Sequence, residues 1–133
     1  MNDSPTSKQV PSLGAFSISL PVEDLSASTT FYEKLGFTAM GGDGESWTIL
    51  SNSSAIIGLF QGMFEKPMLT FNPGWDQDGS ELSEFTDVRD LRRTLSSAND
   101  SISADSTGDS ESGPASFVIT DPDGNPILID QHR

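Results

Sequence analysis

The sequence contains no cysteine, and this absence excludes several kinds of chemistry. Disulfide scaffolds, thiolate zinc sites, iron–sulfur clusters and cysteine nucleophiles all require that residue. Only one histidine is present, His132, so a site with two histidine ligands cannot be built within one chain. Metal centres that depend on several imidazoles are therefore excluded from a single subunit.

Basic residues are scarce as well, because 7 Lys and Arg stand against 20 Asp and Glu, for a formal net charge of −13. Nucleic acids and anionic lipid surfaces are bound mainly through Lys and Arg, so neither is an expected partner. No hydrophobic run approaches the roughly 20 residues of a membrane-spanning helix. The N-terminus lacks an apolar segment behind a basic start, so we expect no secretory signal. These observations predict a cytoplasmic protein with a flexible N-terminal tail over residues 1–13.

The hydrophobic residues that are present, 34% of the chain with 8 Phe and 2 Trp, suffice for one ordinary core. We therefore expect a single domain over residues 14–133. Alternation and turn signals divide it into two modules of the same layout, about 14–62 and 66–131. Each module is predicted to run strand, helix and three strands, over 15–22, 26–37, 37–42, 46–50 and 55–60 and then over 67–72, 88–97, 101–104, 115–120 and 125–131.

The first predicted helix carries recognisable start and stop signals. Asp24 or Ser26 can cap its beginning, and Gly36 can end it. Its apolar face is predicted to consist of Phe31 and Leu35, with Tyr32 beside them.

A short sequence match supports a duplicated module. Val22-Glu-Asp-Leu25 recurs as Val88-Arg-Asp-Leu91, about half the chain later, and we place both at a strand-to-helix joint. Two segments fit neither module: residues 73–87 form an insertion, and the Ser- and Asp-rich residues 96–113 are predicted to form a mobile, solvated loop with at most a short edge strand. The sequence DPDGN at 121–125 predicts a tight hairpin turn.

Three stretches carry a resemblance to a known superfamily: SLPVEDLSASTTFYEKLGF near the start, SWTILSNSSAIIGLF in the middle and FVITDPDGNPILID near the end. With them, residues 14–131 resemble the vicinal-oxygen-chelate superfamily, which includes glyoxalase I, bleomycin-resistance proteins and extradiol dioxygenases. The resemblance implies an α+β fold in which two βαβββ modules form a curled mixed sheet around a cavity. It also implies a homodimer with pockets near the interface.

Glyoxalase-like members place His, Gln or Glu metal ligands on inward-facing strand positions. Carried over one by one, these positions fall on Ser17, Gly58, Met68 and Leu128, and none of the four is such a ligand. Asp130 is the one acid at an inward strand position. The resemblance therefore implies neither a metal ion nor a cofactor here, and it disfavours glyoxalase I and extradiol dioxygenase chemistry.

Side chains two apart on a strand share a face, so the same positions predict what lines the cavity. The inward set is predicted to be Ser17, Ser19, Ile56, Phe60, Met68, Thr70, Asn72, Leu128, Asp130 and His132. An apolar floor with polar groups toward one end is typical of small-molecule pockets.

Large apolar side chains gather in the linker over residues 58–75, namely Phe60, Met63, Phe64, Phe71 and Trp75. They can plug the gap between the modules or pack a dimer interface. Alternatively they form an aromatic surface on which a planar or apolar ligand stacks, with Gln61, Glu65 and Asn72 as hydrogen-bonding groups. Trp47 on a neighbouring strand is open to the same two interpretations.

These features leave several functional hypotheses. The first is metal-free binding of a small aromatic or amphipathic molecule in a dimeric cavity, as in bleomycin-resistance proteins. The second is a lyase or isomerase of the glyoxalase family in which Glu65 or His132 moves a proton. A covalent Ser/Asp/His mechanism is disfavoured because no nucleophile elbow is present. The third is an inert scaffold without a pocket.

Overall fold

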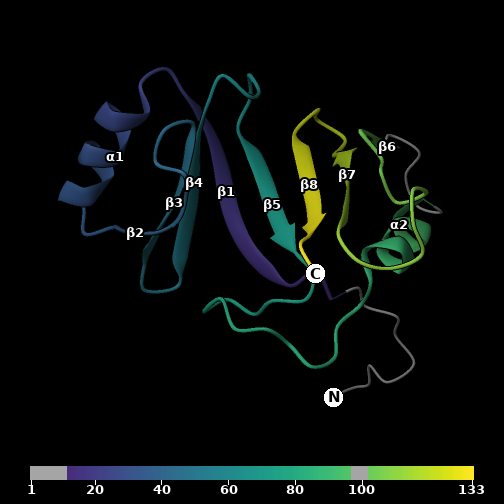
Figure 1. The fold of residues 1–133 in the computed structure, drawn as a ribbon. Helices are drawn as coiled ribbons and strands as arrows, with labels where there is room; N and C mark the ends of the chain where they lie inside the picture. Colours follow the sequence, from purple (N-terminus) through teal and green to yellow (C-terminus); the bar gives the residue numbers. More distant parts are fainter. Residues whose placement is uncertain (1–11, 97–101) are drawn as a thin grey trace, which may run out of the picture.

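The computed structural model describes residues 12–96 and 102–133. They form one mixed sheet of eight strands in the order β2-β3-β4-β1-β5-β8-β7-β6, which curls without closing (Figure 1). The elements are β1 Ala15–Val22, α1 Leu25–Lys34, β2 Thr38–Gly42, β3 Trp47–Asn52, β4 Ala55–Gln61, β5 Met68–Asn72, α2 Val88–Ser96, β6 Ile102–Ser103, β7 Ala115–Thr120 and β8 Pro126–Gln131. The predicted fold class, two βαβββ modules in a curled mixed sheet, is confirmed.

The two modules join edge to edge within one chain. In each module the first and last strands pair in parallel, β1 with β4 and β5 with β8. Between the modules β1 and β5 pair antiparallel, with Ser17 opposite Thr70. All eight strands of this continuous sheet come from one chain.

Both helices pack on the same side of the sheet. Leu25 of α1 is buried with Leu50 and Leu59, and α2 is buried against β7 and β8 with Phe117 and Ile129. Ile18 of β1 pairs with Ile57 of β4 and with Leu69 of β5, and Leu69 pairs in turn with Ile127 of β8. Because residues paired across neighbouring strands share a face, all four lie on the helix side. The other side, which we call the helix-free face, is covered by neither α1 nor α2. None of the helices in the two described ranges is long and apolar enough to cross a membrane.

Helix α1 begins and ends where predicted but presents a different apolar face. The carboxylate of Asp24 accepts from the Ala27 N–H, and Gly36 follows the helix with a φ of 97°. The prediction for Phe31 and Leu35 is wrong, because each is 57% exposed. Leu25 and Tyr32, two turns apart on one side of the helix, pack on the sheet instead.

A glutamine at the end of each module's last strand caps that module's helix. The Leu25 N–H donates to Oε1 of Gln61 over 2.7 Å, and the Val88 N–H donates to Oε1 of Gln131 over the same distance. These two contacts place Leu25 and Val88 at equivalent positions. The predicted Val-x-Asp-Leu match is therefore one helical turn out of step, because Val22 lies in β1 whereas Val88 begins α2.

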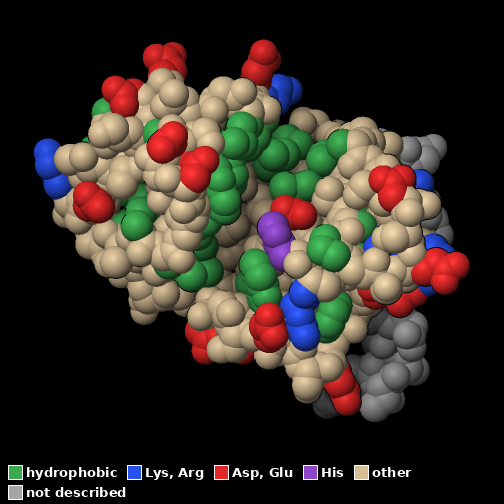
Figure 2. Space-filling model, in the orientation of Figure 1, with side chains coloured by type: hydrophobic (Ala, Val, Ile, Leu, Met, Phe, Trp, Pro, Cys, Tyr) green, Lys and Arg blue, Asp and Glu red, His purple; other side chains and the backbone are tan. Residues whose placement is uncertain are grey.

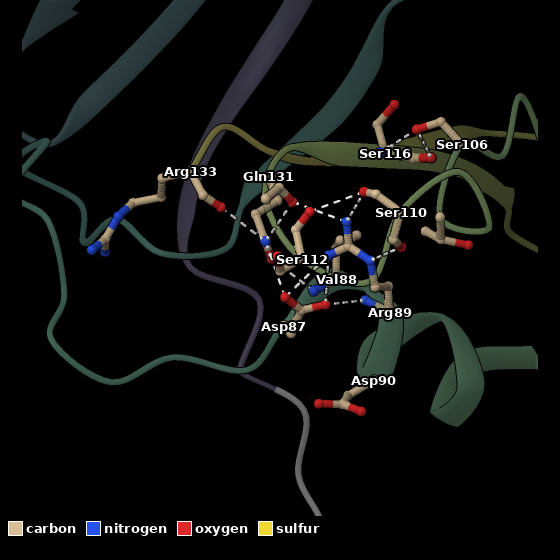
Figure 3. Close-up of polar contacts among 12 residues, drawn as sticks. Asp87, Val88, Arg89, Asp90, Ser106, Ser110, Ser112, Ser116, Gln131 and Arg133 are labelled. Carbon is tan, nitrogen blue, oxygen red and sulfur yellow. Dashed lines mark hydrogen bonds and ion pairs between the residues drawn. The ribbon is translucent and has the colours of Figure 1, made fainter.

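The Gln131 side chain lies in a polar cluster on the helix side (Figure 3). Its Nε2 donates to the Asp87 carboxylate and to the backbone oxygens of Gly113 and Arg133. Arg89 pairs with Asp87 at 3.0 Å and donates to Ser110 and Gly113. Burial alone would raise the pKa of Asp87, but hydrogen bonds from the Arg89 backbone, Gln131 and the Arg89 side chain hold it below its ordinary value.

The predicted loop over residues 96–113 makes side-chain contacts with α2. Residues 105–113, predicted to be a mobile loop, are tied to α2 by the contacts of Arg89 and by the pairing of Arg92 with Asp105 at 2.8 Å. This segment contains acidic residues but no Lys or Arg, so the positive charges that contact it come from α2. Residues 97–101 of that loop and 1–11 of the predicted tail lie outside the described residues.

Arg133 holds the predicted insertion, residues 73–87. Its guanidinium donates to the backbone oxygens of Gly74 and Leu82 and lies 5.1 Å from the centre of the Phe85 ring. The DPDGN turn forms as predicted, because the Asp121 carboxylate accepts from the backbone N–H groups of Asp123 and Asn125.

Candidate binding surface on the helix-free face

The four positions carried over from glyoxalase-like metal ligands lie together on the helix-free face. Ser19 pairs with Gly58 on one side and with Met68 on the other. Thr70 pairs with Ser17 and with Leu128 in the same way. Strand alternation then brings the predicted inward side chains to one surface.

These residues do not fit a metal ion. They offer a hydroxyl, a glycine, a thioether and an aliphatic side chain, whereas hard divalent ions need several converging oxygen or imidazole donors. No group of three or more His, Asp or Glu side chains in residues 12–96 and 102–133 is placed to hold a metal.

Small hydroxyl side chains form the floor of this face. Ser17, Ser19 and Thr70 are all buried, and the Ser19 and Thr70 hydroxyls share a hydrogen bond of 2.6 Å. The Ser17 hydroxyl is 8% exposed by residue and has no hydrogen-bond partner within the described part of the chain. A buried hydroxyl without a partner costs free energy, so this group is available to a ligand or a water molecule.

Three aromatic rings form what we call the aromatic wall: Trp47, Phe60 and Phe64. The Trp47 and Phe60 rings are parallel within 3° at 5.9 Å between centres, and Phe64 lies 5.3 Å from Phe60. Gly58 makes room for this arrangement, because a Cβ added there would lie 2.7 Å from a carbon of the Phe60 ring. A glyoxalase-like ligand position is thus covered by an aromatic ring.

His132 lies toward the other end of the strands, in a defined setting. Its Nε2 is 3.1 Å from Oδ2 of Asp130, and its ring stacks on Trp75 at 5.0 Å and 6°. The hydrogen bond that Nε2 donates to the Asp130 carboxylate raises the pKa of His132, against the lowering effect of partial burial, and the charge of Asp130 adds to the rise. Asn72 fixes this strand end by donating to the Asp130 backbone oxygen.

Figure 2 shows this face in space-filling form. The chain's single histidine, in purple, lies in a hollow between the two halves of the molecule, and hydrophobic side chains line the hollow's edge. We use "the hollow" for this concave region between the aromatic wall and His132.

Several predicted ligand contacts lie elsewhere. Gln61 points to the helix side and caps α1, and Phe71 lies on the helix side at 5.2 Å from Phe16. Met63 and Glu65 are exposed in the turn between β4 and β5, so Glu65 lacks the apolar surroundings that were to make it a base. Ile49 on the helix-free face was missed, although its pairing with Gly58 places it beside Phe60.

A curled, unclosed sheet of two βαβββ modules with both helices on one side is the glyoxalase/bleomycin-resistance-like fold. No protein-family model matches the chain, and no curated protein matches it.

Solved structures show the same fold. A glyoxalase/bleomycin resistance protein/dioxygenase superfamily member from Vibrio splendidus is 15% identical, with 87% of this chain and 97% of that chain covered and a TM-score of 0.60. A Legionella pneumophila structure described as an NAD-dependent benzaldehyde dehydrogenase is 16% identical, with 89% and 99% covered and a TM-score of 0.62. A bleomycin resistance determinant encoded on transposon Tn5 is 21% identical over 88% and 96%, with a TM-score of 0.33. At these identities the likeness to the first two structures shows the fold alone.

Proposed function

We propose that the protein binds a small aromatic or amphipathic molecule in the hollow, without a metal ion. One observation carries the proposal: Trp47 and Phe60 lie parallel on the face that no helix covers, and neither ring is buried in the core. Aromatic rings at a partly open concave surface offer stacking to a planar guest. The Ser17 hydroxyl and the Asp130–His132 pair supply the few polar contacts that orient such a guest.

We further propose a homodimer, with the hollow as a property of each chain. This proposal is supported by the sheet, whose eight strands all come from one chain. This refines the expectation of a cavity shared across a dimer interface.

A second candidate function rests on the Asp130–His132 pair. In a lyase or isomerase of this fold, a carboxylate that orients an imidazole would let His132 accept a proton from a bound substrate and return it. Glu65 does not serve this candidate because it is exposed. Molecules that co-purify with the protein distinguish the two: binding alone releases them unchanged after incubation, whereas an enzyme converts them.

The binding proposal is tested with anilinonaphthalene sulfonate, an aromatic and amphipathic probe whose fluorescence rises in apolar sites. We expect saturable binding, and we expect Trp47→Ala to weaken it about tenfold, because one stacked ring contributes on the order of 1 kcal/mol beyond its buried area. Phe31→Ala is the matched control, since Phe31 is an exposed ring on α1. Equal loss in both variants, or no saturable binding, contradicts the proposal.

Bleomycin is the second probe. It is cationic, and the net charge of −13 favours it at long range. Binding that disappears in moderate salt reflects that charge alone, whereas binding that depends on Trp47 reflects the hollow.

A further inference from the structure

We propose that Nδ1 of His132 is the polar anchor of the hollow and that it receives the carboxylate of an extended amphipathic ligand with an aromatic end. This inference rests on the proposed binding function and names the class of ligand. The imidazole is fixed on two sides, by the contact of Nε2 with Asp130 and by the stacking on Trp75. Nδ1 has no hydrogen-bond partner in residues 12–96 or 102–133, and the side chain is 46% exposed.

The contact with Asp130 favours the form of His132 in which Nδ1 is a donor. Asp130 binds one edge of the ring and favours the imidazolium form, in which both ring nitrogens carry a proton. A donor with partial positive charge prefers an ionised acceptor, and such hydrogen bonds are stronger than those between neutral groups. A carboxylate is the simplest organic group that supplies one.

The remaining described cations are placed to serve other parts of the molecule. Arg89 and Arg92 bind the loop beside α2, Arg93 pairs with Asp90 of the same helix, and Arg133 donates to the backbone of the insertion. Lys34 belongs to α1 on the helix side, and Lys66 lies in the exposed turn after β4. A negative group in the hollow therefore finds its donor at His132.

Strand register sets the shape of the ligand. Phe60 of the aromatic wall pairs with Pro21 near the end of β1, whereas Asn72, beside Asp130, pairs with Ala15 at its start. Along the strand direction, the stretch of β1 from Ala15 to Pro21 spans about 20 Å, and β4 with Phe60 is separated from β8 by β1 and β5. A ring joined to a carboxylate through a flexible chain matches this geometry better than a compact molecule.

The buried Ser17 hydroxyl lies between the two ends, on the same face of β1. It gives an extended ligand a second polar contact. A compact guest at the aromatic wall would reach neither Ser17 nor His132.

Three probes with the same ring and chain test the anchor: ω-phenyloctanoate, ω-phenyloctanamide and ω-phenyloctylamine. Affinities are measured by calorimetry on the full chain. We expect the acid to bind about tenfold more tightly than the amine, with the amide between them, because one charge-assisted hydrogen bond distinguishes them. Phenylacetate, which has the same two groups without the spacer, is expected to bind at least tenfold more weakly than ω-phenyloctanoate.

The variant His132→Gln is expected to remove the preference for the acid while leaving amide binding within about twofold. Lys34→Gln is the matched control, because it also removes one positive charge but on the helix side. Loss of the preference in both variants identifies a general charge effect and overturns the anchor.

One measurement needs no variant. Since the chain has a single histidine, its imidazole nitrogen signals are assigned directly in NMR spectra. Saturation with ω-phenyloctanoate is expected to shift the Nδ1 signal more than the amine does. Tight binding of all three probes without that shift overturns the anchor and leaves the proposed function standing, whereas failure of every probe and of anilinonaphthalene sulfonate overturns both.

Discussion

His132 illustrates how much a single residue depends on its neighbours. Free in solution, an imidazole titrates near neutral pH and rotates between many orientations. Here Asp130 binds Nε2 and raises the pKa, and Trp75 fixes the plane of the ring. The contact with Asp130, which helps to orient the ring, also favours its charged form.

The titration of His132 is therefore a test of its setting. With the pKa raised above 6.5, the imidazolium stabilises the fold fully below that value, and this contribution is lost as the pH rises through the raised pKa. We expect Asp130→Asn to lower the midpoint of the His132 titration, followed by NMR. The stability difference between the two proteins should shrink above the raised pKa. An unchanged midpoint would show that Asp130 does not pair with the ring.

A second residue-scale prediction restores metal ligands. Ser17→His together with Leu128→Glu places an imidazole and a carboxylate on either side of Thr70, on one face of three adjacent strands. We expect this double variant to gain measurable Zn²⁺ or Ni²⁺ binding, detected by calorimetry, whereas Ser17→His alone should gain much less. A folded double variant with no gain would mean that the two side chains do not converge.

At the scale of elements, each module ties its last strand to its helix through one glutamine. The two ties differ in their surroundings. Gln131 is 1% exposed and bonds to the Val88 N–H, Asp87, Gly113 and Arg133, whereas Gln61 is exposed and makes one such contact. The contribution of each glutamine to the stability of the fold is therefore expected to depend on its burial.

Replacing each glutamine by leucine tests this difference. Gln131→Leu leaves a buried N–H, a carboxylate and two carbonyl groups short of a partner, so we expect a loss of about 2–4 kcal/mol in the free energy of unfolding. Gln61→Leu should cost about 1 kcal/mol or less, because water can replace its single contact. Denaturant titrations give both values, and equal losses would contradict the role of burial.

At the scale of the whole molecule, the pairing of β1 with β5 is the decisive contact. It joins the two modules into one sheet, and the curl of that sheet creates the hollow within a single chain. In the proposed function, the net charge of −13 acts on a charged ligand at long range, while the stacked rings and the one histidine act at contact distance.

This architecture predicts one ligand site per chain. We expect ω-phenyloctanoate to bind with a stoichiometry of one per chain in calorimetry, both for the expected dimer and after dilution to the monomer. Sedimentation velocity at the two concentrations gives the oligomeric state. Loss of binding upon dissociation would show that a partner chain completes the site.

Most of the fold could be predicted from the sequence because its signals are local. Alternation in AFSISLPV and ASFVIT, the cap at Asp24 and the DPDGN turn each depend on residues within a few positions. The same alternation predicted that Ser17, Met68 and Leu128 share one face. The predictions for Phe31, Leu35 and Gln61 depended on how elements pack against one another. Phe31 and Leu35 are exposed, and Gln61 lies on the helix side.

The sequence by itself determined which residues form strands and helices, which strand positions face the same way, and that the former ligand positions lack metal-binding groups. Only the tertiary structure decided that Trp75 stacks on His132, that Gln61 and Gln131 cap helices, and that residues 105–113 are tied to α2. The physical reason is range: alternation and capping act over a few residues, whereas these contacts join segments whose approach is set by the pairing and curl of the whole sheet.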